Sequence, residues 1–281
     1  CKGLTMPKRS IKPEALAGTA SFWLMVALLA ALWIAGGASR PDVLGQPIIR
    51  FAAWTLLIGV VLLLPLPPLK RVKPIAAVLA LSLLLIVIQL IALPPSVWAS
   101  LPGRDLFWHA AAAGNEPQVW RPLSVAPEST VNALGSLVVP FVTLVLVAHL
   151  GRDEHWRLLK VLLIMIVAGC LLGVLQFSGT KFDNPFINEI EGLVSGNLAN
   201  RNHFALFVAI GCLIAPAWGF ASGRREVWKM LAALALIPFF VLLILATGSR
   251  MGMLTGAIGI GLGFFAVRQP VRSELRRLSR P

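Results

Sequence analysis

The sequence predicts an all-α integral membrane protein, a helical bundle that crosses the bilayer about eight times. Of its 281 residues, 57% are hydrophobic and only 13% are charged, whereas a soluble domain carries about 25% charged residues. Several apolar runs approach the roughly 20 residues that a helix needs to cross a bilayer. Membrane strands would instead show alternating segments of about ten residues, and the runs in this chain are continuous.

Eight apolar runs are expected to form the crossings. Prolines and charged residues separate these runs, and Pro140, Pro216 and Pro238 fall within them, which membrane helices tolerate when neighbouring helices satisfy the freed carbonyls. We expect one transmembrane domain over residues 1–281. The predicted helices cover residues 20–38, 48–66, 75–93, 128–148, 158–177, 203–221, 230–247 and 251–267.

The distribution of charge predicts the orientation. Segments on the same side as the N-terminus carry 18 of the 25 Lys and Arg residues and 5 of the 12 Asp and Glu residues, so this side holds the whole net charge of +13. Basic residues accumulate in cytoplasmic segments of membrane proteins. Both termini are therefore predicted to be cytoplasmic, and the basic composition requires no nucleic-acid partner.

Two of the predicted outer segments contain polar residues at helix starts. The stretch SGNLANRNHFALFVAIG, residues 195–211, opens the sixth helix with Asn200, Arg201 and Asn202, and the turn ATGSRMG, residues 246–252, opens the eighth with Ser249 and Arg250. A helix N-terminus offers unpaired N–H groups and a partial positive charge. With an arginine at each, two such ends on one face could bind a diphosphate. The alternative is that the arginines snorkel to water and that the asparagines are ordinary caps.

Other features of the chain favour packing or interfacial roles. Trp98, Trp108 and Trp120 lie in the long outer loop 94–127, where we expect a short helix on the membrane and an interfacial aromatic belt. The glycines of the eighth helix, spaced as in GxxxG, predict close helix packing. Glu189 and Glu191 are interpreted as solvated loop residues. No metal-binding, phosphate-loop or dinucleotide motif is present, so we expect no metal and no cofactor.

Three stretches carry a resemblance to a known family. VWRPLSVAPESTVNAL (119–134), SGNLANRNHFALFVAIG and LATGSRMGMLTG (245–256) resemble, in order and spacing, segments of the O-antigen ligase and O-antigen polymerase family of bacterial envelope glycosyltransferases. The resemblance covers roughly residues 75–267, and its last two motifs are fairly specific only when taken together.

The resemblance implies a multi-pass enzyme of the bacterial inner membrane whose site faces the periplasm. Such enzymes move a glycan from undecaprenyl diphosphate to lipid A–core, to another repeat unit or to a protein side chain, without a metal or a nucleotide sugar. The arginines thought to hold the diphosphate match Arg201 and Arg250, and we add the neighbouring Asn200, Asn202 and Ser249 to this predicted site. The identity of donor glycan and acceptor stays open.

The chain departs from that family at its end. Full-length members continue beyond the Ser-Arg turn into a large periplasmic loop with a functionally important histidine, whereas this sequence begins at Cys1 and stops at Pro281. We expect a fragment, a chain completed by a partner, or an inactive protein, so whether it is an enzyme by itself is left open. His203 is the nearest histidine to the predicted site, but it opens a helix and can equally serve as a cap.

Two other classes of function remain as alternatives. A transporter or flippase would line a path with polar residues in mid-helix, and apart from Gln89 and Gln176 the helix interiors are largely apolar. A non-catalytic membrane scaffold in polysaccharide export would not bind undecaprenyl diphosphate.

Overall fold

The computed structural model describes residues 13–38, 44–68, 70, 72–116, 119–180, 192–220 and 226–278, without the side chains of 13–15 and 275–278. This part of the chain is mainly helical, as expected, with one short β-ladder. Contacts divide the chain into two compact units, Cys1–Ile49 with His149–Pro281 and Arg50–Ala148. The predicted single transmembrane domain stays a prediction, and each unit is described by itself.

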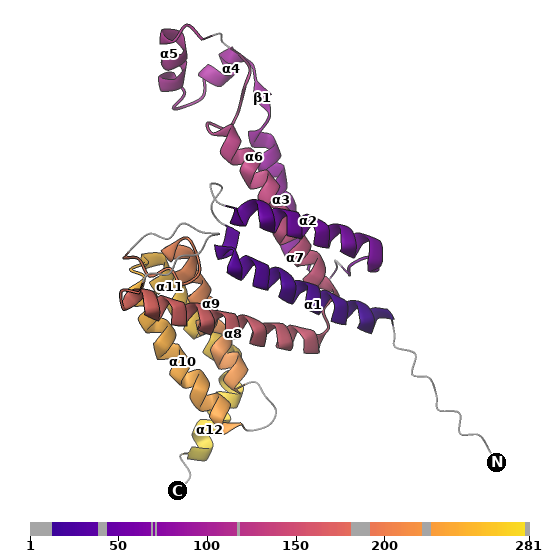
Figure 1. Ribbon diagram of the computed structural model, residues 1–281, viewed down its shortest axis with the longest axis vertical. Coiled ribbons are helices and arrows are strands. Elements are labelled where there is room, and N and C mark those ends of the chain that lie inside the picture. Colours follow the sequence, from indigo (N-terminus) through magenta and orange to yellow (C-terminus); the bar gives the residue numbers. More distant parts are fainter. Residues whose placement is uncertain are drawn as a thin grey trace, which may run out of the picture. The chain divides into compact units, whose positions relative to one another are not determined.

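The first unit is built around helices α8 to α11 (Figure 1). In it, α9 packs against α8, α10 and α11, and α1 packs against α8. The bounds of its elements are α1 Pro13–Ile34, the 3-10 helix η1 Gly36–Ala38, α8 Arg152–Phe177, α9 Arg201–Phe220, α10 Val227–Ala246, α11 Arg250–Ala266 and α12 Arg268–Leu278.

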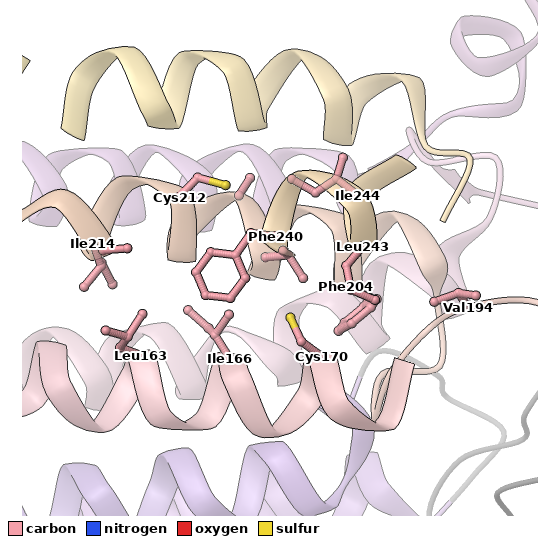
Figure 2. Packing of buried hydrophobic residues seen from close by; sticks show 13 residues of the cluster. Leu163, Ile166, Cys170, Val194, Phe204, Cys212, Ile214, Phe240, Leu243 and Ile244 are labelled. Atoms are coloured by element: carbon pink, nitrogen blue, oxygen red, sulfur yellow. The ribbon is translucent and has the colours of Figure 1, made fainter. Parts of the chain in front are cut away.

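The core of this unit lies where α8, α9 and α10 meet (Figure 2). Phe240 of α10 and Ile166 of α8 both reach the backbone of Gly211 on α9, where an added Cβ atom would lie 2.9 Å from each side chain. Phe204, Phe240 and Ile166 are all fully buried. A glycine at position 211 therefore lets large side chains from two neighbouring helices fill the space beside α9.

The second unit contains a helical part and a small lobe, which consists of β1, α4, α5 and β2. Within it, α3 packs against α6, and Val72, Leu144 and Ala148 form a small buried cluster. β1 pairs antiparallel with β2, with Ala92 opposite Pro122. The bounds are α3 Lys73–Gln89, β1 Ala92–Leu93, α4 Pro95–Ala99, α5 Asp105–Ala113, β2 Arg121–Pro122, α6 Pro127–Ser136 and α7 Val138–His149, while α2, Gly45–Leu63, extends across the boundary between the units.

Six helical stretches in the described residues are long and apolar enough to cross a membrane, or seven if the bent pair α11 and α12 counts as one span. The structure therefore does not confirm the predicted count of eight. The run expected at 75–93 forms only the 17-residue α3, because the chain leaves the helix after Gln89 and enters β1. α11 also has 17 residues and is followed by a bend of 70° into α12.

Helix ends differ from the predicted bounds for local reasons. α1 begins at Pro13 and ends at Ile34, whereas the expected helix was 20–38. Gly36 and Gly37 have φ values of 61° and 76°, a conformation that L-residues with side chains rarely adopt and that ends a helix. The crossing expected at 128–148 is built from α6 and α7, which together form one apolar stretch, Pro127–His149.

Candidate functional site

Helices α9 and α11 run parallel and in close contact. Cβ atoms built on Gly259 and Gly263 of α11 would lie 2.7 Å from the carbonyl oxygen of Ala209 and 2.8 Å from that of Leu213 on α9. Both glycines are buried. Residue numbers rise together along the two helices, so their N-terminal ends lie at the same end of the pair. The GxxxG-type spacing thus serves close packing, as predicted.

The start of α9 is capped by an asparagine. The backbone N–H of Asn202 donates to Oδ1 of Asn200 at 2.8 Å, and the N–H of Phe204 donates to the carbonyl oxygen of Asn200 at 3.0 Å. Asn200, Arg201, Asn202 and His203 are all exposed. Asn200 is therefore the N-cap, and Arg201 and His203 stand in an exposed first turn.

The start of α11 is capped by a buried serine. Oγ of Ser249 accepts a hydrogen bond from the N–H of Gly252 at 3.1 Å, and Oγ1 of Thr247 accepts one from the N–H of Ser249 at 3.2 Å. Ser249 and Thr247 are each only 2% exposed, and Gly248 between them has a φ of 64°. Ser249 therefore fixes the position of the helix start, while its exposed neighbour Arg250 faces outward from the turn.

The two helix starts are neighbours in space. A Cβ atom built on Gly248, in the turn before α11, would lie 3.8 Å from Nη1 of Arg201 on α9. Both Arg201 and Arg250 are exposed, and within the described residues neither guanidinium has an ion pair or a hydrogen bond. The predicted residues are thus brought together as two capped N-termini with two unneutralised arginines.

The residues of the polar stretch that precede α9, from Ser195 onward, hold the loop in place. The side-chain amide of Gln176 on α8 accepts hydrogen bonds from the N–H groups of Ser195 (2.9 Å) and Gly196 (2.8 Å) and donates one to the carbonyl oxygen of Gly196 (2.7 Å). Gln176 therefore fastens the loop before α9 to the end of α8. In the alternative transporter hypothesis, Gln176 is one of the two mid-helix polar residues, and these bonds to the loop backbone explain its presence without a transport path.

Asn197 fastens the same loop to α1. Its Nδ2 donates to the carbonyl oxygen of Trp33 at 2.5 Å, and the side chain is 1% exposed. A Cβ atom built on Gly169 of α8 would lie 3.1 Å from Oδ1 of Asn197. Sequence reasoning did not separate Asn197 from the exposed asparagines, because all of them belong to one polar run beside a helix.

The lobe of the second unit has an aromatic and cationic centre. The guanidinium carbons of Arg104 and Arg121 lie 4.8 Å and 5.3 Å from the centroid of the Trp98 ring, and the indole N–H of Trp98 donates to the carbonyl oxygen of Pro122 at 2.9 Å. Trp98 is 4% exposed. This tryptophan is therefore part of a small core and not of the expected interfacial belt, whereas Trp120 is exposed.

Arg50 has a structural role that the sequence did not predict. In the second unit, Nη2 of Arg50 donates to the carbonyl oxygen and Oδ1 of Asn132, both at 2.6 Å, and to Oγ of Ser136 at 2.7 Å. The side chain lies over Gly135, where an added Cβ atom would be 3.3 Å from Nη1. Arg50 joins α2 to α6 through this contact. In the sequence, the only sign of it is Gly135, a small residue between the polar residues Asn132 and Ser136.

In the described part of the chain, no group of three or more His, Cys, Asp and Glu side chains is placed so that it could hold a metal ion. The loop acids Glu189 and Glu191 lie outside the described residues. Within the described residues the side chain of His203 has no hydrogen-bond partner, so no contact orients its ring as a general base requires.

These features define the chain as a predominantly helical protein with several helices apolar enough to span a membrane and a cationic pair of helix starts at one end of a four-helix core. Compared with known proteins, the chain matches no protein-family model, no curated protein and no solved structure. Only the sequence motifs and this geometry therefore bear on its function.

Proposed function

We propose that this protein is a membrane glycosyltransferase of the O-antigen ligase or polymerase type, acting in the bacterial inner membrane on a periplasmic, lipid-linked substrate. In the proposed reaction, the bond breaks between the anomeric carbon of the glycan and the diphosphate oxygen of its undecaprenyl carrier. A hydroxyl oxygen of the acceptor forms the new bond to that carbon, its proton passes to a base, and the lipid diphosphate leaves with the electron pair.

The observation that carries this proposal is the position of Arg201 beside Gly248, two residues before Arg250, at the starts of two parallel helices. A departing diphosphate gains negative charge, and fixed cations and unpaired N–H groups lower the energy of a transition state in which that charge develops. Asn200 and Ser249 contribute by capping and thereby hold the two starts in place. Asn202 presents an exposed amide within the same turn as Arg201.

Transfer of a lipid-linked oligosaccharide in membranes that contain the expressed protein tests the proposal. We expect Arg201→Ala and Arg250→Ala each to lower transfer by about a hundredfold or more, the effect typical of removing one preorganised charge-stabilising donor. Arg152→Ala is the matched control, because Arg152 is an exposed arginine at the N-terminus of α8, whose other end carries the Gln176 contact to the loop before α9.

Binding of a polyprenyl diphosphate to the purified protein separates the site from the chemistry. Weaker binding by both arginine variants, with unchanged binding by the Arg152 variant, would support an anion site even in a preparation that lacks transfer. Normal transfer and normal binding in both variants would contradict the proposed role of the two arginines. Absence of both transfer and binding in the unmodified protein would contradict the proposal as a whole and favour the scaffold alternative.

A further inference from the structure

A groove of about 670 Å³ runs along the outside of α8, α9 and α10 in the first unit. Its lining is apolar except for Lys160 of α8 and includes Ile164 of the same helix, Trp218 of α9, and Ala235 and Phe239 of α10. This volume lies in the usual range of ligand sites, about 300–1,000 Å³. The groove is therefore large enough to receive a small apolar molecule or a long chain.

The floor of the groove belongs to the packed core. Leu163 is buried within that core, and Trp218 and Phe239 pack against it. The small side chain of Ala235 leaves space between these larger groups. Because its floor is held by three helices, the groove is a fixed feature of the first unit.

Lys160 marks one end of the groove. It is the lining residue nearest the N-terminus of α8, it is exposed, and within the described residues it has no ion pair. Trp218 lies in the last two turns of α9, beside the start of α10, and its ring centroid is 5.7 Å from that of Trp228. Lysine and tryptophan together are typical of the level at which lipid headgroups meet the hydrocarbon.

We infer that this groove binds one acyl chain of an anionic phospholipid, with the phosphate of that lipid at Lys160. An apolar slot between membrane helices matches the chain, and a single unneutralised cation at its end matches the headgroup; basic pockets between membrane helices on the cytoplasmic side bind anionic headgroups in this way. The charge distribution of the sequence assigns this end of α8 to the cytoplasmic side.

The lipid site is separate from the proposed diphosphate site. Gln176, which fastens the loop before α9, lies 16 residues after Lys160 on the continuous helix α8, a rise of about 24 Å. The inference therefore does not rest on the proposed function. A second copy of the chain is the less favoured occupant, because a two-fold interface through the groove would bring two copies of this lysine near each other.

Native mass spectrometry of the purified protein with added phosphatidylglycerol or phosphatidylcholine tests the inference. We expect retention of one phosphatidylglycerol in preference to phosphatidylcholine, and about fivefold weaker retention in Lys160→Gln. Lys160→Arg should keep the preference. Lys73→Gln, which removes an exposed lysine from the start of α3 in the other unit, should change nothing.

A groove-filling variant tests the acyl-chain part. Ala235→Trp should lower retention of both lipids, whereas Leu231→Trp, at an exposed position on α10 outside the groove lining, should not. A brominated acyl chain should quench tryptophan fluorescence less in Trp218→Phe than in the unmodified protein. Equal retention of the two lipids, no effect of Lys160→Gln, or a dimer that Ala235→Trp dissociates would each overturn the inference.

Discussion

At the scale of single residues, Gly196 shows why the loop before α9 has its particular sequence. Its φ of 60° lies in the left-handed region, and an added Cβ atom would lie 2.7 Å from Cδ2 of Phe204. Phe204 is fully buried and also touches Gly173 of α8, so its ring has no free space to enter. A side chain at position 196 would therefore meet both backbone strain and a steric clash.

Replacement of this glycine should destabilise the protein. We expect Gly196→Ala to lower the free energy of unfolding by about 2–5 kcal/mol, about 1–2 from the left-handed backbone and about 1–3 from overpacking. Thermal unfolding in detergent, followed by tryptophan fluorescence, measures the change. Gly179→Ala is the matched control: Gly179 has a φ of 87° but nothing within 4 Å of an added Cβ atom, so only the backbone penalty should remain. Equal effects of the two variants would contradict the clash with Phe204.

At the scale of elements, the contact between α9 and α11 decides where the two arginines lie. The buried glycine face of α11 brings its backbone against Ala209 and Leu213 of α9. Because the helices are parallel, a change in the middle of this contact alters the distance between their N-terminal ends. Packing within the bundle and the geometry of the candidate site are therefore linked.

Substitution on the two sides of α11 should have opposite effects. Gly259→Ala should lower the free energy of unfolding by about 1–3 kcal/mol, because its Cβ atom would lie 2.7 Å from the carbonyl oxygen of Ala209. Gly261→Ala should be neutral or stabilising by up to about 1 kcal/mol, since nothing lies within 4 Å of its Cβ position. The same unfolding measurement distinguishes them. Polyprenyl diphosphate binding should fall only in Gly259→Ala, and unchanged binding in that variant would separate the site from the helix contact.

At the scale of the whole molecule, charge predicts the orientation of the chain. In the predicted topology of eight crossings, all of the net charge of +13 falls on the segments that share a side with the N-terminus, and such an asymmetry favours a cytoplasmic location for that side. The proposed diphosphate site depends on this orientation, because its substrate is expected on the periplasmic side.

Reporter fusions test the orientation directly. A reporter that is active only outside the cytoplasm should be active when fused near residue 190, which precedes α9 in the sequence, and inactive when fused near residue 224, which precedes α10. A cytoplasmic reporter should show the reverse at both positions. Cytoplasmic activity near residue 190 would invert the predicted topology and would remove the periplasmic site.

The number of membrane crossings could be predicted only approximately. The sequence predicts eight apolar segments, and a helix overlaps each of them. Apolar segments can be found in this way because hydrophobicity is a local property of the sequence. The lengths of α3 and α11 depend instead on where the chain turns, at β1 after Gln89 in one case and at the bend before Arg268 in the other. Such turns are set by the packing of the segments that follow.

The sequence by itself determined the helical, membrane-type character of the chain, the positions of its charged residues and the polar residues that can cap the starts of α9 and α11, since these follow from composition and from local hydrogen-bonding chemistry. Only the tertiary structure shows that one polar run contains both the buried Asn197 and the exposed Arg201. It alone also shows that Trp98 lies buried beneath two arginines and that Arg201 lies beside Gly248. Burial and adjacency arise from contacts between segments far apart in the chain, so no local pattern contains them.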